Sequence, residues 1–228
     1  TTSSTITFTV NGANDAPTAS NNTVTTNEDT TYTFTASDFG FSDVDGDTLS
    51  SVTVSALSGS DGTFLLNGVA ITGSTSVTKT QIDSGLLTFV PDSNENGSSY
   101  NTFTFTVNDG TTDSASSYTM TVDVTAVNDA PTASNNTVTT NEDTDHTFAA
   151  SEFGFTDVDG DSLDHVSIET LPSNGTLLLS GSAVSAGDQI SAANISNLVF
   201  RPAANANGAS YDTFTFTVND GTTDSASS

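Results

Sequence analysis

The run TFTFTVNDGTTDSASS occupies Thr102–Ser117 and recurs without change at Thr213–Ser228. In its first half the apolar residues Phe103, Phe105 and Val107 alternate with threonines. This period of two is typical of a half-buried β-strand, and the Asn-Asp-Gly step that follows is a turn signal. The run therefore predicts a β-protein that is built from repeated units.

A second run, NDAPTASNNTVTTNEDT, occupies Asn14–Thr30 and recurs at Asn128–Thr144. The segment TITFTVNGAND at Thr5–Asp15 aligns with TMTVDVTAVND at Thr119–Asp129, so the last strand of one repeat directly precedes the next repeat. Self-similarity of this length identifies a tandem-repeat protein. The domains that we expect are the last strand of a preceding repeat (1–13), one complete repeat (14–127) and a second repeat that lacks its last strand (128–228).

Several other short segments alternate in the same way, among them Val52–Ala56 and Met120–Val124. We expect about seven short strands per repeat, and at most one helical turn, at Asp83–Leu87. Short, evenly spaced strands separated by turn signals are typical of an antiparallel β-sandwich. The predicted fold is therefore all-β, with tandem immunoglobulin-like or cadherin-like Greek-key sandwiches.

The composition is strongly acidic, because 28 Asp and Glu residues stand against 2 Lys and Arg residues and give a net charge of −26. We expect no binding to nucleic acid or anionic lipid, since both need basic side chains. So large a charge opposes compaction, and divalent cations are the obvious external source of neutralising charge. The absence of cysteine excludes a disulfide scaffold. No apolar run reaches the ~20 residues of a membrane helix, so we expect no membrane insertion in this segment.

The motif Asp-Val-Asp-Gly-Asp occurs at Asp43–Asp47 and again at Asp157–Asp161. Ca²⁺ takes about six to eight oxygen ligands in flexible geometry, so carboxylates at alternate positions around a glycine suit it. An EF-hand loop would need glycine at Thr48 and glutamate at Val54, so this loop is of another kind. The alternative is an acidic β-turn on a solvated surface. The Ca²⁺ ligands that the motif predicts are Asp43, Asp45, Asp47, Asp157, Asp159 and Asp161.

Two further acidic motifs recur in both repeats. Asn27-Glu28-Asp29 is repeated at 141–143, and Asn14-Asp15-Ala16-Pro17 is repeated at 128–131. The second motif lies where one repeat becomes the next, and its proline stiffens the backbone there. An aspartate at this junction could share a cation with an acidic loop of the adjacent repeat and so convert a hinge into a rigid joint. A plain turn before a strand explains the same residues.

Together, these motifs resemble bacterial cadherin-like tandem repeats, the units of large secreted adhesins of the type I secreted, RTX kind. The resemblance rests on the phrase VNDAPTA…TNEDT…FSDVDGDTL…FTVNDG, which both repeats follow closely over essentially the whole chain. It implies an extracellular, cell-surface location, Ca²⁺ as the bound ion, and a role as a structural extender in adhesion or biofilm formation. The ligands that it implies are Glu28 or Glu142, Asp15 or Asp129, the pairs Asp43 and Asp45 or Asp157 and Asp159, and the Asp-Gly residues Asp109 and Asp220.

The sequence offers little for catalysis. His146 and His165 align with Tyr32 and Ser51 of the other repeat, so neither histidine belongs to the repeated unit. No serine forms a recognisable motif with a histidine, and the paired carboxylates lie in short repeated loops. We therefore expect a protein that is not an enzyme.

The sequence allows several partners other than metal. The adjacent repeats of the same chain are the first expected partner. Polysaccharide binding is an alternative, with the recurring Tyr100 and Tyr211 as its candidate aromatic residues, and adhesion between like repeats is another. In addition, Thr5–Val10 is a spare last strand while the second repeat lacks one, so molecules could join head to tail by strand donation.

Overall fold

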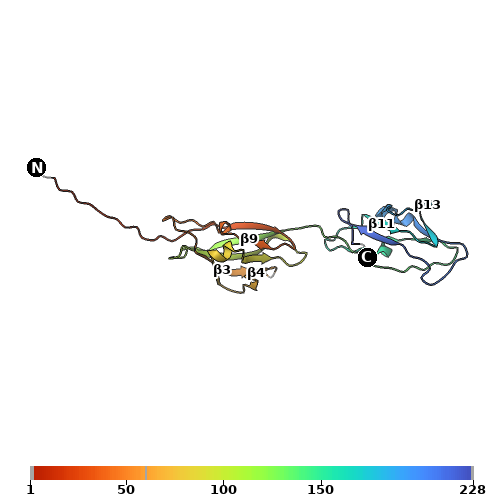
Figure 1. The fold of residues 1–228 in the computed structure, drawn as a ribbon, viewed down its shortest axis with the longest axis horizontal. Helices are drawn as coiled ribbons and strands as arrows, with labels where there is room; N and C mark the ends of the chain where they lie inside the picture. Colours follow the sequence, from red (N-terminus) through yellow and green to blue (C-terminus); the bar gives the residue numbers. More distant parts are fainter. Residues whose placement is uncertain (1–2, 60, 227–228) are drawn as a thin grey trace. The chain divides into compact units, whose positions relative to one another are not determined.

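A computed structural model describes residues 3–59 and 61–226, and the chain divides into two compact units, Thr1–Val127 (unit 1) and Asn128–Ser228 (unit 2) (Figure 1). Nearly all regular structure is β-strand, which confirms the predicted all-β sandwich class. No helix within these described ranges is long and apolar enough to cross a membrane.

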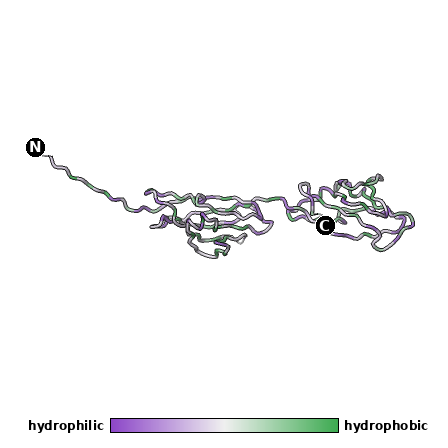
Figure 2. The backbone as a smooth tube through the Cα atoms, in the orientation of Figure 1, coloured by the Kyte–Doolittle hydropathy of each residue, from purple (hydrophilic) through white to green (hydrophobic). Residues whose placement is uncertain are grey.

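Unit 1 consists of two sheets, with strand orders β1-β9-β8-β3-β6 and β2-β7-β4-β5. Hydrophobic and hydrophilic residues are interspersed along the backbone (Figure 2). The elements of unit 1 are β1 (Asn22–Asn27), β2 (Tyr32–Thr33), η1 (Ala36–Phe39), β3 (Ser51–Ser58), β4 (Thr63–Leu66), β5 (Val69–Ala70), β6 (Thr75–Thr78), α1 (Lys79–Asp83), β7 (Leu87–Val90), β8 (Gly97–Asn108) and β9 (Tyr118–Thr125).

The core of unit 1 is a cluster of phenylalanines between the two sheets. Phe103 and Phe105 of β8 are at most 1% exposed, as their alternation predicts. The ring of Phe103 packs edge-on against Phe34 (centroids 5.7 Å apart) and Phe64 (5.0 Å). Such pairs add stability beyond the apolar area that they bury.

One strand pair departs from the predicted antiparallel pattern. β1 pairs in parallel with β9, and Val24 lies opposite Val122. The sequence NTVTTN offers one apolar side chain to the core, so its alternation is too weak to predict a strand. The partner strand supplies the hydrogen bonds instead, and Val24 is 5% exposed in the result.

Unit 2 also consists of two sheets, with strand orders β14-β11-β16 and β10-β15-β12-β13. Its core is separate and centres on Phe153, Ile168, Leu177 and Leu198. The elements of unit 2 are β10 (His146–Thr147), η2 (Ala150–Phe153), β11 (His165–Thr170), β12 (Gly175–Leu179), β13 (Ser182–Ala183), β14 (Gln189–Ser191), η3 (Ala192–Asn197), β15 (Leu198–Pro202) and β16 (Thr215–Asn219).

The helical turn expected at Asp83–Leu87 is wrong, because the helix of unit 1 is α1, which ends at Asp83. The cause is a capping box. The Thr78 hydroxyl accepts the N–H of Gln81 at 3.2 Å, and the Gln81 side-chain oxygen accepts the N–H of Thr78 at 2.9 Å. This exchange fixes the start of the helix, and Gly85, with φ of 70°, follows its end.

A carboxylate holds two segments of unit 2 together. Asp212 accepts hydrogen bonds from the backbone N–H groups of Ser173 (3.0 Å), Asn174 and Thr213 (2.9 Å). Burial raises the pKa of this carboxyl, but the donors outweigh burial and hold the pKa below its ordinary value. The matching residue of unit 1 is Asn101, so the chain contains its own neutral counterpart.

This carboxylate predicts an acid sensitivity for unit 2. Because the pKa of Asp212 is lower in the folded state than in the unfolded chain, its contribution is present above about pH 4 and is lost as pH falls through the folded-state pKa. Asp212→Asn should lower the unfolding midpoint of unit 2 at neutral pH and flatten its pH dependence below about pH 4. Denaturant unfolding, followed by amide NMR signals of each unit, measures both effects. A pH profile unchanged by the substitution would contradict the prediction.

Candidate metal centre

The acidic loop of unit 1 is anchored on both sides. On one side Ser42 and Thr18 exchange two backbone hydrogen bonds of 2.8 Å, and on the other side Leu49 is buried in the core. Between these anchors Gly46, with φ of 85°, permits the sharp turn that a residue with a side chain would resist. The loop from Asp43 to Asp47 is therefore held in one conformation.

The loop gathers its three carboxylates. One oxygen atom from each of Asp43, Asp45 and Asp47 lies within 4.8 Å of the others, and the same is true of Asp157, Asp159 and Asp161. In unit 1 the Oδ1 atom of Asp43 accepts the N–H groups of Asp45 (2.8 Å) and Asp47 (3.1 Å). The structure thus brings the predicted loop ligands together in both units.

One oxygen in each loop lacks a partner. Oδ2 of Asp43 and Oδ2 of Asp157 are inaccessible to solvent, and neither accepts a hydrogen bond within the described part of the chain. A buried carboxylate oxygen without a partner is costly, and the adjacent like charges raise that cost. A divalent cation would coordinate this oxygen and would also offset the repulsion between the carboxylates. The donor set therefore fits Ca²⁺.

The segment that leads into each unit also reaches this loop. The backbone N–H of Asp15 donates to Oδ2 of Asp45 at 2.6 Å, and that of Asp129 donates to Oδ2 of Asp159 at 2.7 Å. The Asn14 side-chain amide donates to Oδ2 of Asp109 at 3.0 Å. Asp15 and Asp109 therefore lie at the same end of unit 1 as the acidic loop.

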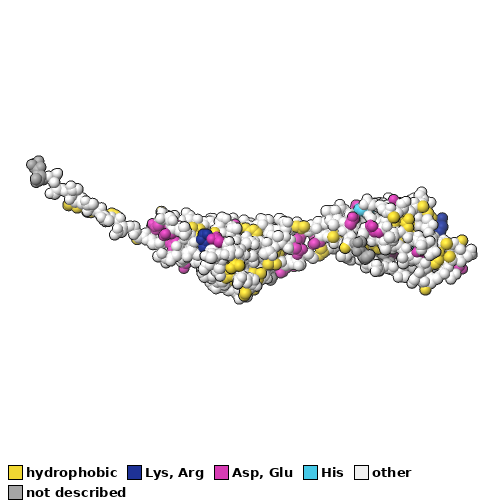
Figure 3. Space-filling view, in the orientation of Figure 1, with side chains coloured by type: hydrophobic (Ala, Val, Ile, Leu, Met, Phe, Trp, Pro, Cys, Tyr) yellow, Lys and Arg dark blue, Asp and Glu magenta, His cyan; other side chains and the backbone are white. Residues whose placement is uncertain are grey.

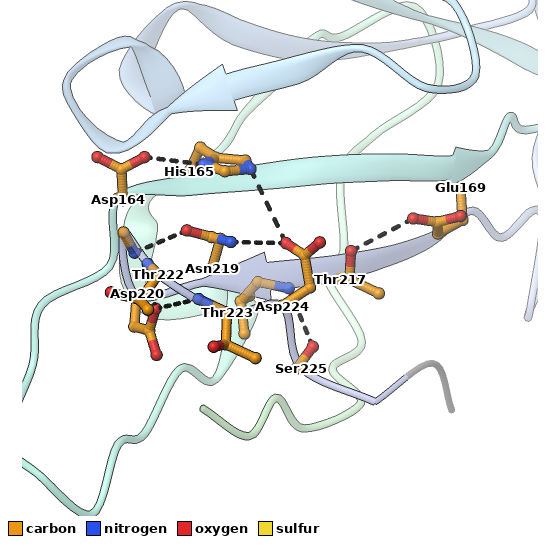
Figure 4. A network of polar contacts seen from close by, with 12 residues as sticks. Asp164, His165, Glu169, Thr217, Asn219, Asp220, Thr222, Thr223, Asp224 and Ser225 are labelled. Carbon is orange, nitrogen blue, oxygen red and sulfur yellow. Dashed lines mark hydrogen bonds and ion pairs between the residues drawn. The ribbon is translucent and has the colours of Figure 1, made fainter. Parts of the chain in front are cut away.

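In unit 2, hydrogen bonds to Asp220 hold the Asp-Gly turn in place. Asp220 accepts the N–H groups of Thr222 (2.6 Å) and Thr223 (2.7 Å) through Oδ1 (Figure 4). Its Oδ2 atom accepts the Asn128 amide at 3.0 Å. The Thr223 N–H and then the Asn128 amide lower the pKa of this carboxyl. The equivalent donors, Thr112 first, lower the pKa of Asp109. Both aspartates are therefore ionised and oriented at neutral pH.

The structure does not bring the acidic residue of the first strand region to this cluster within one unit. Glu28 is 2% exposed, and its carboxylate accepts the Val127 N–H at 2.5 Å and the Asn96 amide at 3.3 Å. Asn96 precedes β8 and Asp109 follows it, so Glu28 lies at the opposite end of unit 1 from the acidic loop. Glu142 is exposed and accepts the equivalent amide, from Asn207, at 3.2 Å.

Sequence reasoning missed the asparagines that orient these acids. Asn14 and Asn96 each donate to a predicted carboxylate, and the Asn94 N–H donates to Asp29 at 3.3 Å. The available signal was the retention of these asparagines in both repeats, where the pattern Asn-x-Asn-Gly begins at Asn94 and again at Asn205.

A further acidic group and the two histidines belong to single units. Asp61, Asp92 and Glu95 also bring oxygens within 4.8 Å of one another, but the second repeat carries Asn and two Ala at these positions. His146 lies 3.2 Å from Glu152, and His165 lies 2.8 Å from Asp164 (Figure 4). None of these groups is part of the repeated chemistry.

Comparisons with known proteins agree with a tandem organisation. The sequence matches the family model described as a bacterial Ig domain twice, at residues 14–125 and 128–228. A search of curated proteins gives no match. Among solved structures, an endo-fucoidan hydrolase of glycoside hydrolase family 107 and a variant of it are 19% and 20% identical over 96% of this chain. This chain spans 28% of the hydrolase's length, and the TM-score is 0.30. Since the two family matches cover nearly the whole sequence, the chain belongs to the bacterial Ig domain family.

Proposed function

We propose that each unit binds Ca²⁺ at its acidic loop and that the ion stiffens a non-catalytic extender repeat of an extracellular, bacterial cell-surface protein. Such a repeat would hold an adhesive region away from the cell, as in the cadherin-like adhesins that the motifs resemble. The observation that carries the proposal is the unpartnered Oδ2 of Asp43, and of Asp157, inside a cluster of three carboxylates.

The chemistry of the loop favours Ca²⁺ over other divalent cations. All the side chains in the cluster are carboxylates, and hard oxygen ligands suit Ca²⁺ and Mg²⁺ rather than softer metals. Mg²⁺ prefers strict octahedral geometry and retains its waters, whereas Ca²⁺ tolerates irregular cages. Basic side chains are scarce on the surface (Figure 3), so the protein supplies almost no cation of its own to these loops.

The carbohydrate-binding alternative finds no support in the aromatic residues. The Tyr100 hydroxyl accepts the Asp92 N–H at 3.2 Å and donates to Glu95 at 3.1 Å, and the Tyr211 hydroxyl accepts the Ala203 N–H at 3.3 Å. These tyrosines tie loops together rather than offer flat faces to a sugar. Among the aromatic residues of the described chain, only Phe8 is exposed.

Calorimetric titration of Ca²⁺ into the chelator-treated chain tests the proposal. We expect binding heat with a dissociation constant of about 10⁻⁴–10⁻³ M, which is typical of extracellular calcium modules. The melting temperature should rise with free Ca²⁺ once binding saturates, because the ion binds the folded state. Mg²⁺ at the same concentration should give a smaller rise. Absence of heat and of a melting shift up to about 10 mM Ca²⁺ would overturn the proposal.

A further inference from the structure

Among the described residues, 3–59 and 61–226, Glu28 is the only acidic residue that is buried, with 2% of its surface exposed. A buried carboxylate is costly unless hydrogen bonds satisfy it, so its partners indicate its role. The Oε1 atom of Glu28 accepts the backbone N–H of Val127 at 2.5 Å, and the Oε2 atom accepts the Asn96 side-chain amide at 3.3 Å. Both oxygens are therefore engaged by donors of unit 1.

The course of the backbone explains why a side chain accepts the Val127 N–H. β1 runs parallel to β9, and just beyond their last pair the Glu28 N–H still donates to the Thr125 carbonyl at 2.9 Å. Asp29 then adopts a left-handed conformation, with φ of 55°, and the chain that formed β1 turns away from the chain that formed β9. The Glu28 carboxylate, rather than a backbone carbonyl, therefore accepts the N–H of Val127.

Glu28 joins three segments that are distant in the sequence. They are the turn that follows β1, the loop with Asn96 that precedes β8, and the segment with Val127 that follows β9. The turn and the amide contact recur in unit 2, where Asp143 has φ of 55° and Asn207 donates to Glu142 at 3.2 Å. This acidic turn is therefore a property of the repeat.

The residue that Glu28 holds has a particular place in the chain. Val127 is the last residue of unit 1, and two residues later the N–H of Asp129 donates to Asp159 of unit 2 at 2.7 Å. Without the bond from Val127 to Glu28, the backbone would be released as far back as Thr125, whose carbonyl accepts the Glu28 N–H. The Glu28 carboxylate therefore shortens the stretch of chain that can move between the two anchored N–H groups.

We infer that Glu28 is a positioning residue that fixes the point where the chain leaves unit 1, and that it has this role instead of the Ca²⁺ ligation that the family resemblance implies. A cation at Glu28 would displace the Val127 N–H or the Asn96 amide from a buried carboxylate. Within the described part of the chain, Glu28 also belongs to none of the groups of three acidic side chains that could hold a metal ion. The inference does not depend on whether the acidic loops bind Ca²⁺.

Amide hydrogen exchange of the 228-residue chain in chelator tests this role. Glu28→Met keeps the side-chain volume but removes the strong acceptor, so the Val127 N–H should exchange about tenfold faster or more, as expected for loss of a hydrogen bond to a charged group. Glu28→Gln retains a side-chain oxygen and should keep the wild-type rate. The amide of Val122, which is buried in β9, should stay protected in both variants and so exclude global unfolding. Glu142→Met, the same change in unit 2, is the matched control and should leave Val127 unaffected.

Calorimetric titration of Ca²⁺ separates the positioning role from a ligand role. A neutral amide is a poorer Ca²⁺ ligand than a carboxylate, so Glu28→Gln would weaken binding if Glu28 were a ligand, whereas a positioning role leaves the affinity and the number of ions unchanged. Weaker Ca²⁺ binding by Glu28→Gln, or a wild-type exchange rate at Val127 in Glu28→Met, would overturn the inference. A wild-type chain that binds no Ca²⁺ would overturn the metal proposal alone, and the exchange rates in chelator would still support or overturn the positioning role.

Discussion

Phe103→Ala is expected to destabilise unit 1 by about 3–5 kcal/mol, the usual cost of truncating a fully buried phenylalanine. The ring is 1% exposed and packs edge-on against Phe34 and Phe64, so the deletion leaves a cavity bounded by rings that are themselves fixed. The same deletion in unit 2, Phe214→Ala, is expected to cost clearly less. Phe214 is only partly buried, and its edge-on partner is Phe148 at 5.6 Å.

Denaturant unfolding followed by amide signals of each unit would measure this difference. A loss of about 3–5 kcal/mol is a large part of the stability of a domain of this size. Unit 1 of the Phe103→Ala variant should therefore unfold at a clearly lower denaturant concentration than unit 2. Val69→Ala is the control, because Val69 is 70% exposed and surface substitutions change stability by about 0.5 kcal/mol or less. Equal losses at the two phenylalanines would contradict the prediction, because Phe103 is buried and Phe214 is only partly buried.

The contrast between the two units shows where prediction from sequence ends. The segments 22–27 and 136–141 have the same sequence, yet the first is β1 and the second forms no strand. The same holds for β8 and the shorter β16. Strand formation in these segments is therefore decided by a tertiary partner, β9, rather than by local preference. Periodicity predicts which side chains face the core, but it does not supply the neighbour that completes the sheet.

The features that sequence did predict are those with local causes. The alternation of phenylalanine and threonine in β8 predicted its buried face, and the Asp-Val-Asp-Gly-Asp motif predicted a tight acidic loop. The helix predicted at Asp83–Leu87 lies too late in the chain, because the capping exchange of Thr78 with Gln81 starts α1 at Lys79. The buried Glu28 and its Asn96 partner lie 68 residues apart, so only the fold could bring them together.

Asp43→Asn is expected to change stability in opposite directions with and without Ca²⁺. In chelator, the substitution removes one of three charges within 4.8 Å of one another and replaces the unpartnered Oδ2 by an amide that can donate to its neighbours. The Oδ1 acceptor for Asp45 and Asp47 is kept. The metal-free variant should therefore be as stable as the wild type or slightly more stable. Asp157→Asn should do the same in unit 2.

In Ca²⁺ the order should reverse. Ca²⁺ at a free concentration of about 100 times the dissociation constant of the site stabilises the folded state by ~2.7 kcal/mol. For a domain of roughly 100 residues this corresponds to a rise in melting temperature of about 10 °C or more. Each Asp→Asn variant should lose that rise in its own unit and keep it in the other. Asp83→Asn, which removes one exposed carboxylate that pairs with Lys79, should keep both rises.

The crossing of these two orders separates a cation site from an ordinary acidic turn. If Asp43 served only to accept the N–H groups of Asp45 and Asp47, asparagine would serve equally well. The melting curves of the variant and the wild type would then agree in both buffers. If the carboxylate stabilised the loop by its charge alone, the variant would be less stable than the wild type in both buffers. Only a bound cation makes the aspartate destabilising in chelator and stabilising in Ca²⁺. The unpartnered oxygen destabilises the loop without the ion, and the same oxygen becomes a ligand when the ion is bound.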